Sequence, residues 1–188
     1  MEKIGYRRGF TYVEVIMTVS IVVILSIGGY IKYERFKESI QLREAKLKIE
    51  EIYSRYIIKS LDTKEKYEIT LDLKNENIEV FLSKLNVRLE NIELPKKLKY
   101  ATIYDEVQLS KIKSMTTLDG NLSNSFTVYI FDYDGLAKYR IAFYNYQPNK
   151  FLKINIYKNM GVKDATYKNI VKYHKSIEAK NHIGWKLE

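Results

Sequence analysis

The longest apolar stretch of the chain runs from Phe10 to Ile31, and Glu14 is its only acidic or basic residue. At a rise of about 1.5 Å per residue, a helix over this stretch is about 33 Å long, which is sufficient to cross a hydrocarbon core of about 30 Å. The pattern predicts a membrane anchor. An acid inside such an anchor indicates a functional residue with a cationic partner. The alternative is that Glu14 lies at the level of the lipid headgroups.

From Lys32 to about Ser60 the pattern changes to an amphipathic one. Apolar side chains recur at intervals of three and four, and charged residues occupy the opposite face. No proline interrupts residues 10–61. We therefore expect one continuous helix of about 75 Å, with a second half that packs against the rest of the protein through Leu42, Ala45, Ile49, Ile52 and Tyr56.

The remaining sequence has the alternation of a β-rich domain. Asp134-Gly135 between two alternating apolar runs predicts a hairpin, and Pro148-Asn149 suits a second turn. These signals predict a three-stranded antiparallel meander at 126–133, 136–146 and 151–158. The sequence thus predicts an α+β fold, in which the long N-terminal helix packs on a small antiparallel sheet.

The elements before and after this meander have weaker signals. Alternation predicts strands at 67–73 and 87–94, with two weaker ones at 99–104 and 107–113, and residues 116–125 have the composition of a loop. Apolar residues at helical spacing predict a short helix at 76–85 and another near 164–179. Residues 183–187 alternate like a closing edge strand.

Charge is unevenly distributed along the 188 residues, whose net charge is +9. Residues 136–188 carry 11 Lys and Arg against Asp164, Glu178 and Glu188, a net +8. The first nine residues carry Lys3, Arg7 and Arg8 against Glu2, a net +2. The sequence has no cysteine, so neither a disulfide nor a thiolate metal site is available.

The start of the chain resembles the processing site of type IV prepilins and of the pseudopilins of type II secretion and competence systems. The residues that carry this resemblance are the basic Arg7 and Arg8, then Gly9, Phe10-Thr11, Glu14 and the long apolar helix. The resemblance implies that a prepilin peptidase cuts after Gly9 and methylates the new amine of Phe10. It also implies that Glu14 pairs with the N-terminal amine of a neighbouring subunit. A pilin-like fold is implied as well.

Two other interpretations of this stretch remain open. One is a plain signal anchor that is never cleaved. The other is a secretory signal peptide with a small-x-small site at Ser26-Ile27-Gly28, although the apolar run is long for such a segment.

The expected organisation is a leader at 1–9, a transmembrane or filament-core helix at 10–31, an amphipathic continuation at 32–61 and a globular head at 62–188. The basic leader follows the positive-inside tendency. It predicts a single-pass protein of the cytoplasmic (inner) membrane with its head outside the cytoplasm, and later a cell-surface or periplasmic filament. The expected partners are the peptidase, other pilin or pseudopilin subunits, and the membrane.

Residues with catalytic or ligating chemistry are few. His174 and His182 lack neighbouring acids, so we interpret them as solvated or partly buried imidazoles, and Asp132-Tyr133-Asp134-Gly135 as a plain turn rather than a calcium loop. No enzyme activity, metal or cofactor is predicted. The basic, aromatic C-terminal third could bind DNA by charge and stacking, or be a solvated surface. Its candidate contacts are Lys138, Arg140, Lys153, Tyr157, Lys168 and Lys172.

These observations favour a pilin-like subunit, a minor one, of a type IV pilus or a type II secretion-like pseudopilus. The first alternative is a DNA-binding competence pilin. The second is an uncleaved single-span membrane protein whose head binds a partner.

Overall fold

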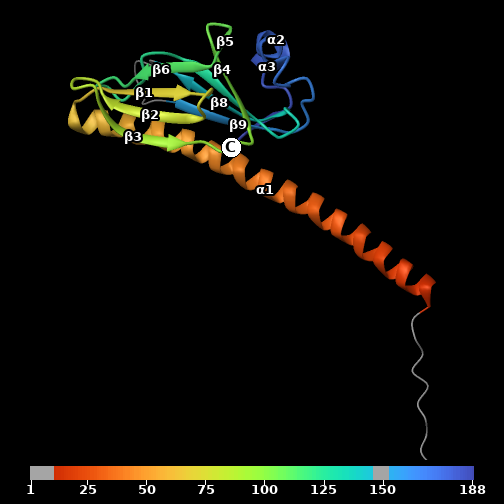
Figure 1. Cartoon of the computed structure of the whole chain (residues 1–188). Coiled ribbons are helices and arrows are strands. Elements are labelled where there is room, and N and C mark those ends of the chain that lie inside the picture. The colour runs from red at the N-terminus through yellow and green to blue at the C-terminus, as the bar shows by residue number, and fades with distance from the viewer. Residues whose placement is uncertain (1–10, 146–152) are drawn as a thin grey trace, which may run out of the picture. The chain divides into compact units, whose positions relative to one another are not determined.

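The computed structural model describes residues 11–145 and 153–188, and the chain divides into two compact units, Met1–Ser39 and Ile40–Glu188. The helix α1 (Tyr12–Thr63) begins in the first unit and ends in the second (Figure 1). It is continuous over 52 residues, which confirms the single long helix expected from the absence of proline. It stops where Lys64 adopts a left-handed backbone with φ 54°.

In the second unit, the amphipathic part of α1 is buried along the predicted stripe. Leu42, Ala45, Ile49, Ile52 and Tyr56 are all buried. Tyr53 and Ile57 widen the stripe to the apolar face typical of a helix that packs on a sheet.

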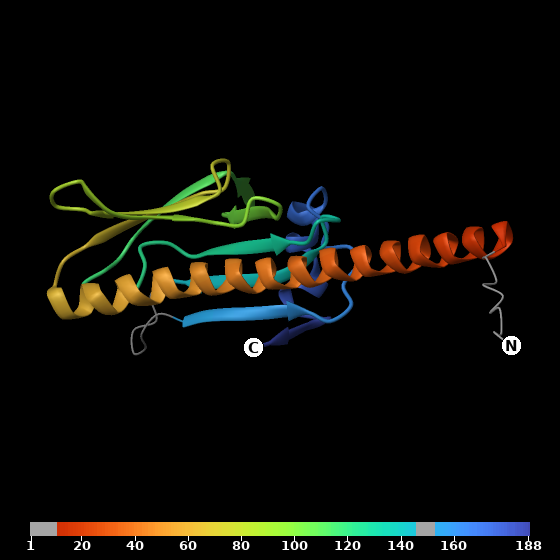
Figure 2. The same ribbon diagram turned by 60° about the horizontal axis from the view of Figure 1, so that its bottom comes forward.

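Two antiparallel sheets pack with this part of the helix, where the sequence predicted one (Figure 2). The four-stranded sheet has the order β3-β2-β1-β6, and the six-stranded sheet has the order β10-β9-β8-β7-β4-β5. The first consists of β1 (Tyr67–Asp72), β2 (Asn77–Leu82), β3 (Val87–Glu93) and β6 (Lys111–Met115). The second consists of β4 (Lys99–Tyr104), β5 (Val107–Leu109), β7 (Phe126–Phe131), β8 (Ala137–Tyr144), β9 (Lys153–Asn159) and β10 (Trp185–Leu187).

The predicted helix at 76–85 is wrong, because these residues form β2 and the turn that follows it. Ile78 and Val80 alternate into the core, whereas Leu85 lies exposed in the turn. The apparent helical spacing combined residues from both faces of a strand. The predicted strand at 107–113 is also divided, since β5 and β6 belong to different sheets.

The C-terminal segment forms two short helices in place of the single helix predicted near 164–179. These are α2 (Ile170–Lys175) and α3 (Ile177–Lys180). Ser176 separates them with an extended backbone, and its side chain accepts a hydrogen bond from the backbone N–H of Ala179. The N-cap preference of serine therefore outweighs the continuous helical spacing. The closing strand is confirmed as β10.

The six-stranded sheet has a core on each face. One core lies among α1 and the inner faces of both sheets, and includes Ile49, Tyr53, Ile69 and Phe143. The second lies on the other face of the sheet, where the segment that contains α2 and α3 covers it through Ile170, Tyr173, Ala179 and Trp185.

Candidate anchor and assembly site

The first turn of α1 is closed by a reciprocal pair of hydrogen bonds between Thr11 and Glu14. The backbone N–H and the hydroxyl of Thr11 both donate to Oε2 of Glu14, at 2.7 and 3.0 Å. The backbone N–H of Glu14 donates in return to the Thr11 hydroxyl at 3.3 Å. This is a capping box. Sequence reasoning missed this role, although a Thr followed three residues later by Glu before an apolar run is its usual signature.

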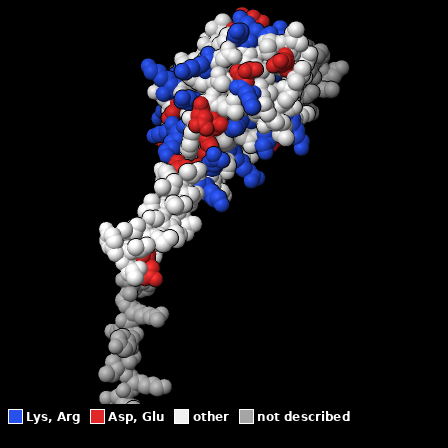
Figure 3. Space-filling model, turned by 90° about the vertical axis from the view of Figure 1, so that its right-hand side faces the viewer, with Lys and Arg blue, Asp and Glu red and all other residues white. Residues whose placement is uncertain are grey.

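The described residues of the first unit expose a long apolar surface. Every residue from Thr11 to Tyr33 is exposed, and Figure 3 shows this part of the helix as a largely uncharged stretch with an acidic group near its far end. The hydroxyls of Thr18, Ser20 and Ser26 each donate to the backbone carbonyl four residues earlier, at 2.7, 2.8 and 2.7 Å. Their hydrogen-bonding needs are therefore met inside the helix, as lipid or a helix bundle requires.

By length and composition, α1 could cross a membrane, and it is the one such helix in the part of the chain that the structure describes. The predicted cleavage and methylation residues, Gly9 and Phe10, lie outside the described residues, as do Arg7 and Arg8. Glu14 is thus the predicted assembly residue whose geometry is known.

The structure does not bring the six candidate DNA contacts together on one surface. Arg140 and Tyr157 are buried in the core under α2 and α3, which corrects the prediction for these two residues. The basic and aromatic composition of the C-terminal third does not show that a second layer covers that face of the sheet. Lys138 lies 3.1 Å from a carboxylate oxygen of Asp132.

The other three candidates are lysines on separate elements. Lys168 lies just before α2 and Lys172 lies in it, and both are exposed. Lys153 begins β9, and its side chain lies outside the described residues. Residues 132–136, beside Lys138, form a turn, in which Asp132 accepts a hydrogen bond from the Leu136 N–H at 2.7 Å and Gly135 has φ +83°.

Arg140 joins β8 to the C-terminal layer. Its Nη1 donates to the carbonyl of Ala179 at 2.7 Å and lies 3.1 Å from Nδ1 of His182. Because a guanidinium has donors only, Nδ1 must be an unprotonated acceptor, and His182 is neutral. The guanidinium also lies over the rings of Tyr129 and Tyr157, at 5.9 and 5.6 Å, where cation–π attraction partly replaces a carboxylate.

His174 is the second imidazole in this layer. Its Nδ1 lies 2.9 Å from the hydroxyl of Tyr129. Burial lowers the pKa of His174 to about 4, and the nearby charge of Arg140 contributes in the same direction. The same two causes lower the pKa of His182. Both imidazoles are therefore neutral parts of the packing at neutral pH.

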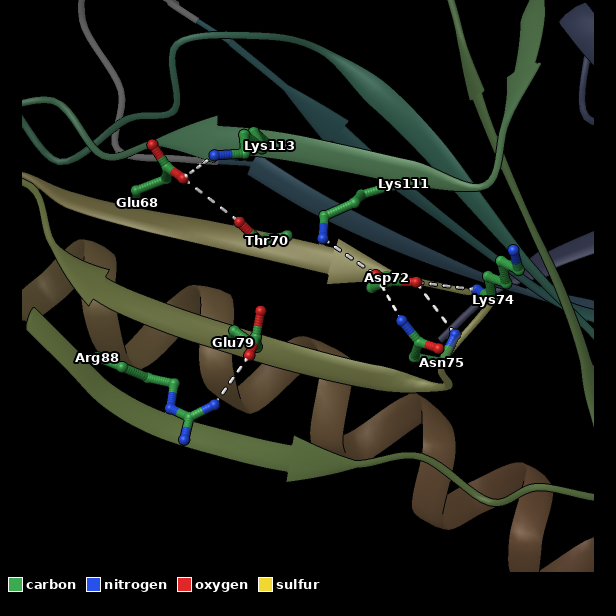
Figure 4. A network of polar contacts seen from close by, with 9 residues as sticks. All are labelled: Glu68, Thr70, Asp72, Lys74, Asn75, Glu79, Arg88, Lys111 and Lys113. Atoms are coloured by element: carbon green, nitrogen blue, oxygen red, sulfur yellow. Dashed lines mark hydrogen bonds and ion pairs between the residues drawn. The ribbon is translucent and has the colours of Figure 1, made fainter. Parts of the chain in front are cut away.

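The outer face of the four-stranded sheet carries an ordered set of polar contacts that sequence reasoning missed (Figure 4). Asp72 accepts hydrogen bonds from the backbone N–H groups of Lys74 and Asn75, at 3.1 and 3.0 Å, and its Oδ2 lies 3.0 Å from Lys111 Nζ. Burial alone would raise the pKa of Asp72, but the hydrogen bonds from Asn75 and Lys111 outweigh it and lower the pKa. These contacts fix the β1–β2 turn.

Two of the comparisons with known proteins find no match: no protein-family model matches the chain, and neither does any curated protein. Among solved structures, the chain is similar to the minor pseudopilin EpsH from the type 2 secretion system of Vibrio cholerae. The sequence identity is 14%, the TM-score is 0.43, and the match covers 59% of this chain and 95% of that chain.

Proposed function

We propose that this chain is a pilin-like subunit, held in the membrane by the first part of α1 and assembled through that helix into a filament. In this account a prepilin peptidase cuts after Gly9 and methylates the amine of Phe10. Glu14 then pairs with the N-terminal amine of a neighbouring subunit. The filament is a type IV pilus or a type II secretion-like pseudopilus, in which the chain is a minor, non-catalytic subunit.

The observation that carries this proposal is the contrast between Glu14 and the other polar side chains of the apolar segment. The hydroxyls of Thr18, Ser20 and Ser26 are satisfied within the helix. Glu14 accepts two hydrogen bonds from Thr11, but those bonds do not neutralise its charge. A carboxylate inside an apolar environment is costly unless it is paired with a cation. Cleavage after Gly9 would supply such a cation, because it would create a positively charged N-terminal amine on Phe10 that can pair with Glu14 of a neighbouring subunit.

The fold supports the same proposal from the other end of the helix. The second part of α1 has an apolar stripe buried against the sheets, whereas the first part presents exposed apolar side chains all around. A helix that is apolar on all faces requires a membrane or other apolar helices around it. The account places the second unit outside the cytoplasm and the subunit first in the membrane, later in a filament.

The alternative of DNA capture has less support, because Arg140 and Tyr157 are buried and Lys138 faces Asp132. The alternative of an uncleaved anchor predicts a different response to mutation. A simple anchor should tolerate Glu14→Leu, since leucine favours both the helix and the bilayer.

The test is to express Glu14→Leu with the cognate assembly system, and to measure the amount of subunit in sheared filaments and in membranes. The proposal predicts normal membrane levels and loss from the filaments. Glu34→Leu, an acid in the same helix beyond the apolar stretch, is the matched control and should assemble. Equal incorporation of Glu14→Leu and the original chain would refute a role of Glu14 in assembly.

A further inference from the structure

One end of the second unit carries exposed apolar side chains on two segments that are joined to each other: the turn after β9, and α3 with the turn that follows it. The backbone N–H of Met160 donates to the carbonyl of Gly184 at 2.9 Å, and the N–H of Ile183 donates to the carbonyl of Glu178 at 2.9 Å. These bonds bring together the backbones that carry three exposed side chains: Met160, Ile177 and Ile183, which are 62%, 75% and 57% exposed. Single exposed apolar residues are common, but a connected group of them marks an interaction site.

The backbone that presents this group is fixed. The side chain of Asn159 accepts hydrogen bonds from the N–H groups of Gly161 and Val162, at 2.8 and 2.7 Å, and donates to the carbonyl of Ala137 at 2.7 Å. Gly184 has φ +75°, and a Cβ there would lie 2.6 Å from Cγ2 of Val162. Met160 and Ile183 therefore lie in tightly packed turns, and Ile177 is the first residue of α3.

The segments that carry the apolar group are rich in lysine. Residues 158–188 contain seven lysines against Asp164, Glu178 and Glu188, which gives a net charge of +4. Lys163, Lys180 and Lys186 are exposed, and each lies three residues in the sequence from one of the apolar side chains. Lys and Arg side chains are spread over the end of the second unit drawn in Figure 3, with fewer Asp and Glu among them. Apolar tips within a basic rim are typical of a surface that binds an anionic lipid interface.

The position of this surface along the chain also favours the membrane. The hydroxyl of Tyr133 donates to the side-chain oxygen of Gln41 at 2.7 Å, and the neighbouring Gly135 accepts from the N–H of Tyr167 at 2.8 Å. Asn159 at the first turn donates to the carbonyl of Ala137, two residues after Gly135, so the two joined turns lie at the end of the second unit where α1 enters it. Only residues 32–40 separate the apolar segment from this end, and since they belong to α1 they span about 14 Å.

We propose that this surface, consisting of Met160, Ile177, Ile183, Lys163, Lys180 and Lys186, docks the second unit on the anionic face of the bilayer that holds the anchor. The proposal rests on the membrane anchoring proposed above. Docking holds the unit against the headgroups before assembly, and extraction into a filament releases it. The lysines contact lipid phosphates, and the apolar tips enter the interface.

The test uses the full chain reconstituted in vesicles, and the absence of cysteine allows single labels. Asn181→Cys, exposed next to Ile183, carries an environment-sensitive fluorophore, and Leu85→Cys carries it in a turn of the four-stranded sheet, far from the proposed surface in the sequence. Quenching by spin-labelled lipid is compared between phosphatidylcholine vesicles and vesicles that also contain phosphatidylglycerol. We expect quenching at residue 181, but not at 85, and only with the anionic lipid.

Lys163→Gln with Lys180→Gln should lower the ratio of docked to free unit about 25-fold, since each basic residue near an anionic surface contributes about fivefold. Lys64→Gln with Lys66→Gln, at the end of α1 and the start of β1, is the matched control and should leave the ratio unchanged. Equal quenching in both lipids, or at both labels, would overturn the docking. So would shielding of residue 181 from aqueous iodide without lipid quenching, which would indicate a second copy of the chain.

Retention of the chain during an alkaline carbonate wash separates this proposal from the anchor. A retained chain without lipid quenching at residue 181 refutes the docking and leaves the anchor intact. Release of the chain by carbonate refutes the anchor, and the docking with it.

Discussion

Acid should loosen the layer that α2 and α3 form over the six-stranded sheet, and His174 should account for much of the effect. In the folded protein the pKa of His174 is about 4, below its ordinary value of 6.5. Between these two pH values the unfolded chain binds a proton that the folded chain does not bind. The free energy of unfolding therefore falls as the pH falls from 6.5 to 4, and below 4 this residue contributes no further loss.

The size of this loss follows from the two pKa values. A base whose pKa falls from 6.5 to about 4 on folding costs the folded state at most about 3 kcal/mol at pH 4, at about 1.4 kcal/mol for each tenfold change. The imidazole is partly exposed, and solvent screening reduces the expected loss to about 2 kcal/mol. His182 should add to the loss, because burial and Arg140 also lower its pKa.

The assay is urea unfolding of the full chain in detergent at several pH values between 4 and 7, for the original chain and for His174→Gln. Trp185 is the single tryptophan, and its Nε1–H donates to the Tyr173 hydroxyl at 2.8 Å inside this layer. Its fluorescence therefore reports the layer directly. The difference between the two chains isolates His174 from the carboxylates that also titrate. A difference that does not change between pH 7 and pH 4 would refute the reasoning.

Two further substitutions test the packing of the second unit. Ile49 is fully buried between α1 and the sheets, so Ile49→Ala should lower the free energy of unfolding by about 2–5 kcal/mol. Leu47→Ala, on the exposed side of the same helix, should change it by less than about 0.5 kcal/mol. Equal effects of the two substitutions would contradict the observed buried face of the helix. Asp72→Ala removes the acceptor for the N–H groups of Lys74 and Asn75 and should cost about 1–2 kcal/mol in the same urea assay; an unchanged midpoint would show that the β1–β2 turn does not depend on these bonds.

Local patterns predicted the parts of the fold that depend on local physics. The absence of proline and the three-to-four spacing of Leu42, Ala45 and Ile49 were sufficient for α1 and its buried face. Asp134-Gly135 was sufficient for the β7–β8 hairpin. The division of the strands between two sheets could not be predicted in this way, because it depends on which strands pair across long separations in the sequence. Apolar and polar residues would alternate in the same way along β5 and β6 whether the two strands belonged to one sheet or to two.

The wrong prediction that Arg140 and Tyr157 are surface residues also arises from contacts between residues that are distant in the sequence. Arg140 is a charged residue in a strand, and such a residue ordinarily faces solvent. Its burial depends on a second layer that supplies the carbonyl of Ala179, Nδ1 of His182 and two tyrosine rings. No short window of sequence contains these partners. The capping box of Thr11 and Glu14, in contrast, lies within four consecutive residues and could have been recognised from the sequence.

The most direct test of the account is the intact mass of the N-terminal peptide, isolated from membranes of cells that also express a prepilin peptidase. The account predicts a peptide that begins at Phe10 and carries the mass of one additional methyl group. The same peptide from cells without the peptidase should begin at Met1. A peptide that begins at Met1 in both cells would contradict the central claim and leave an uncleaved anchor.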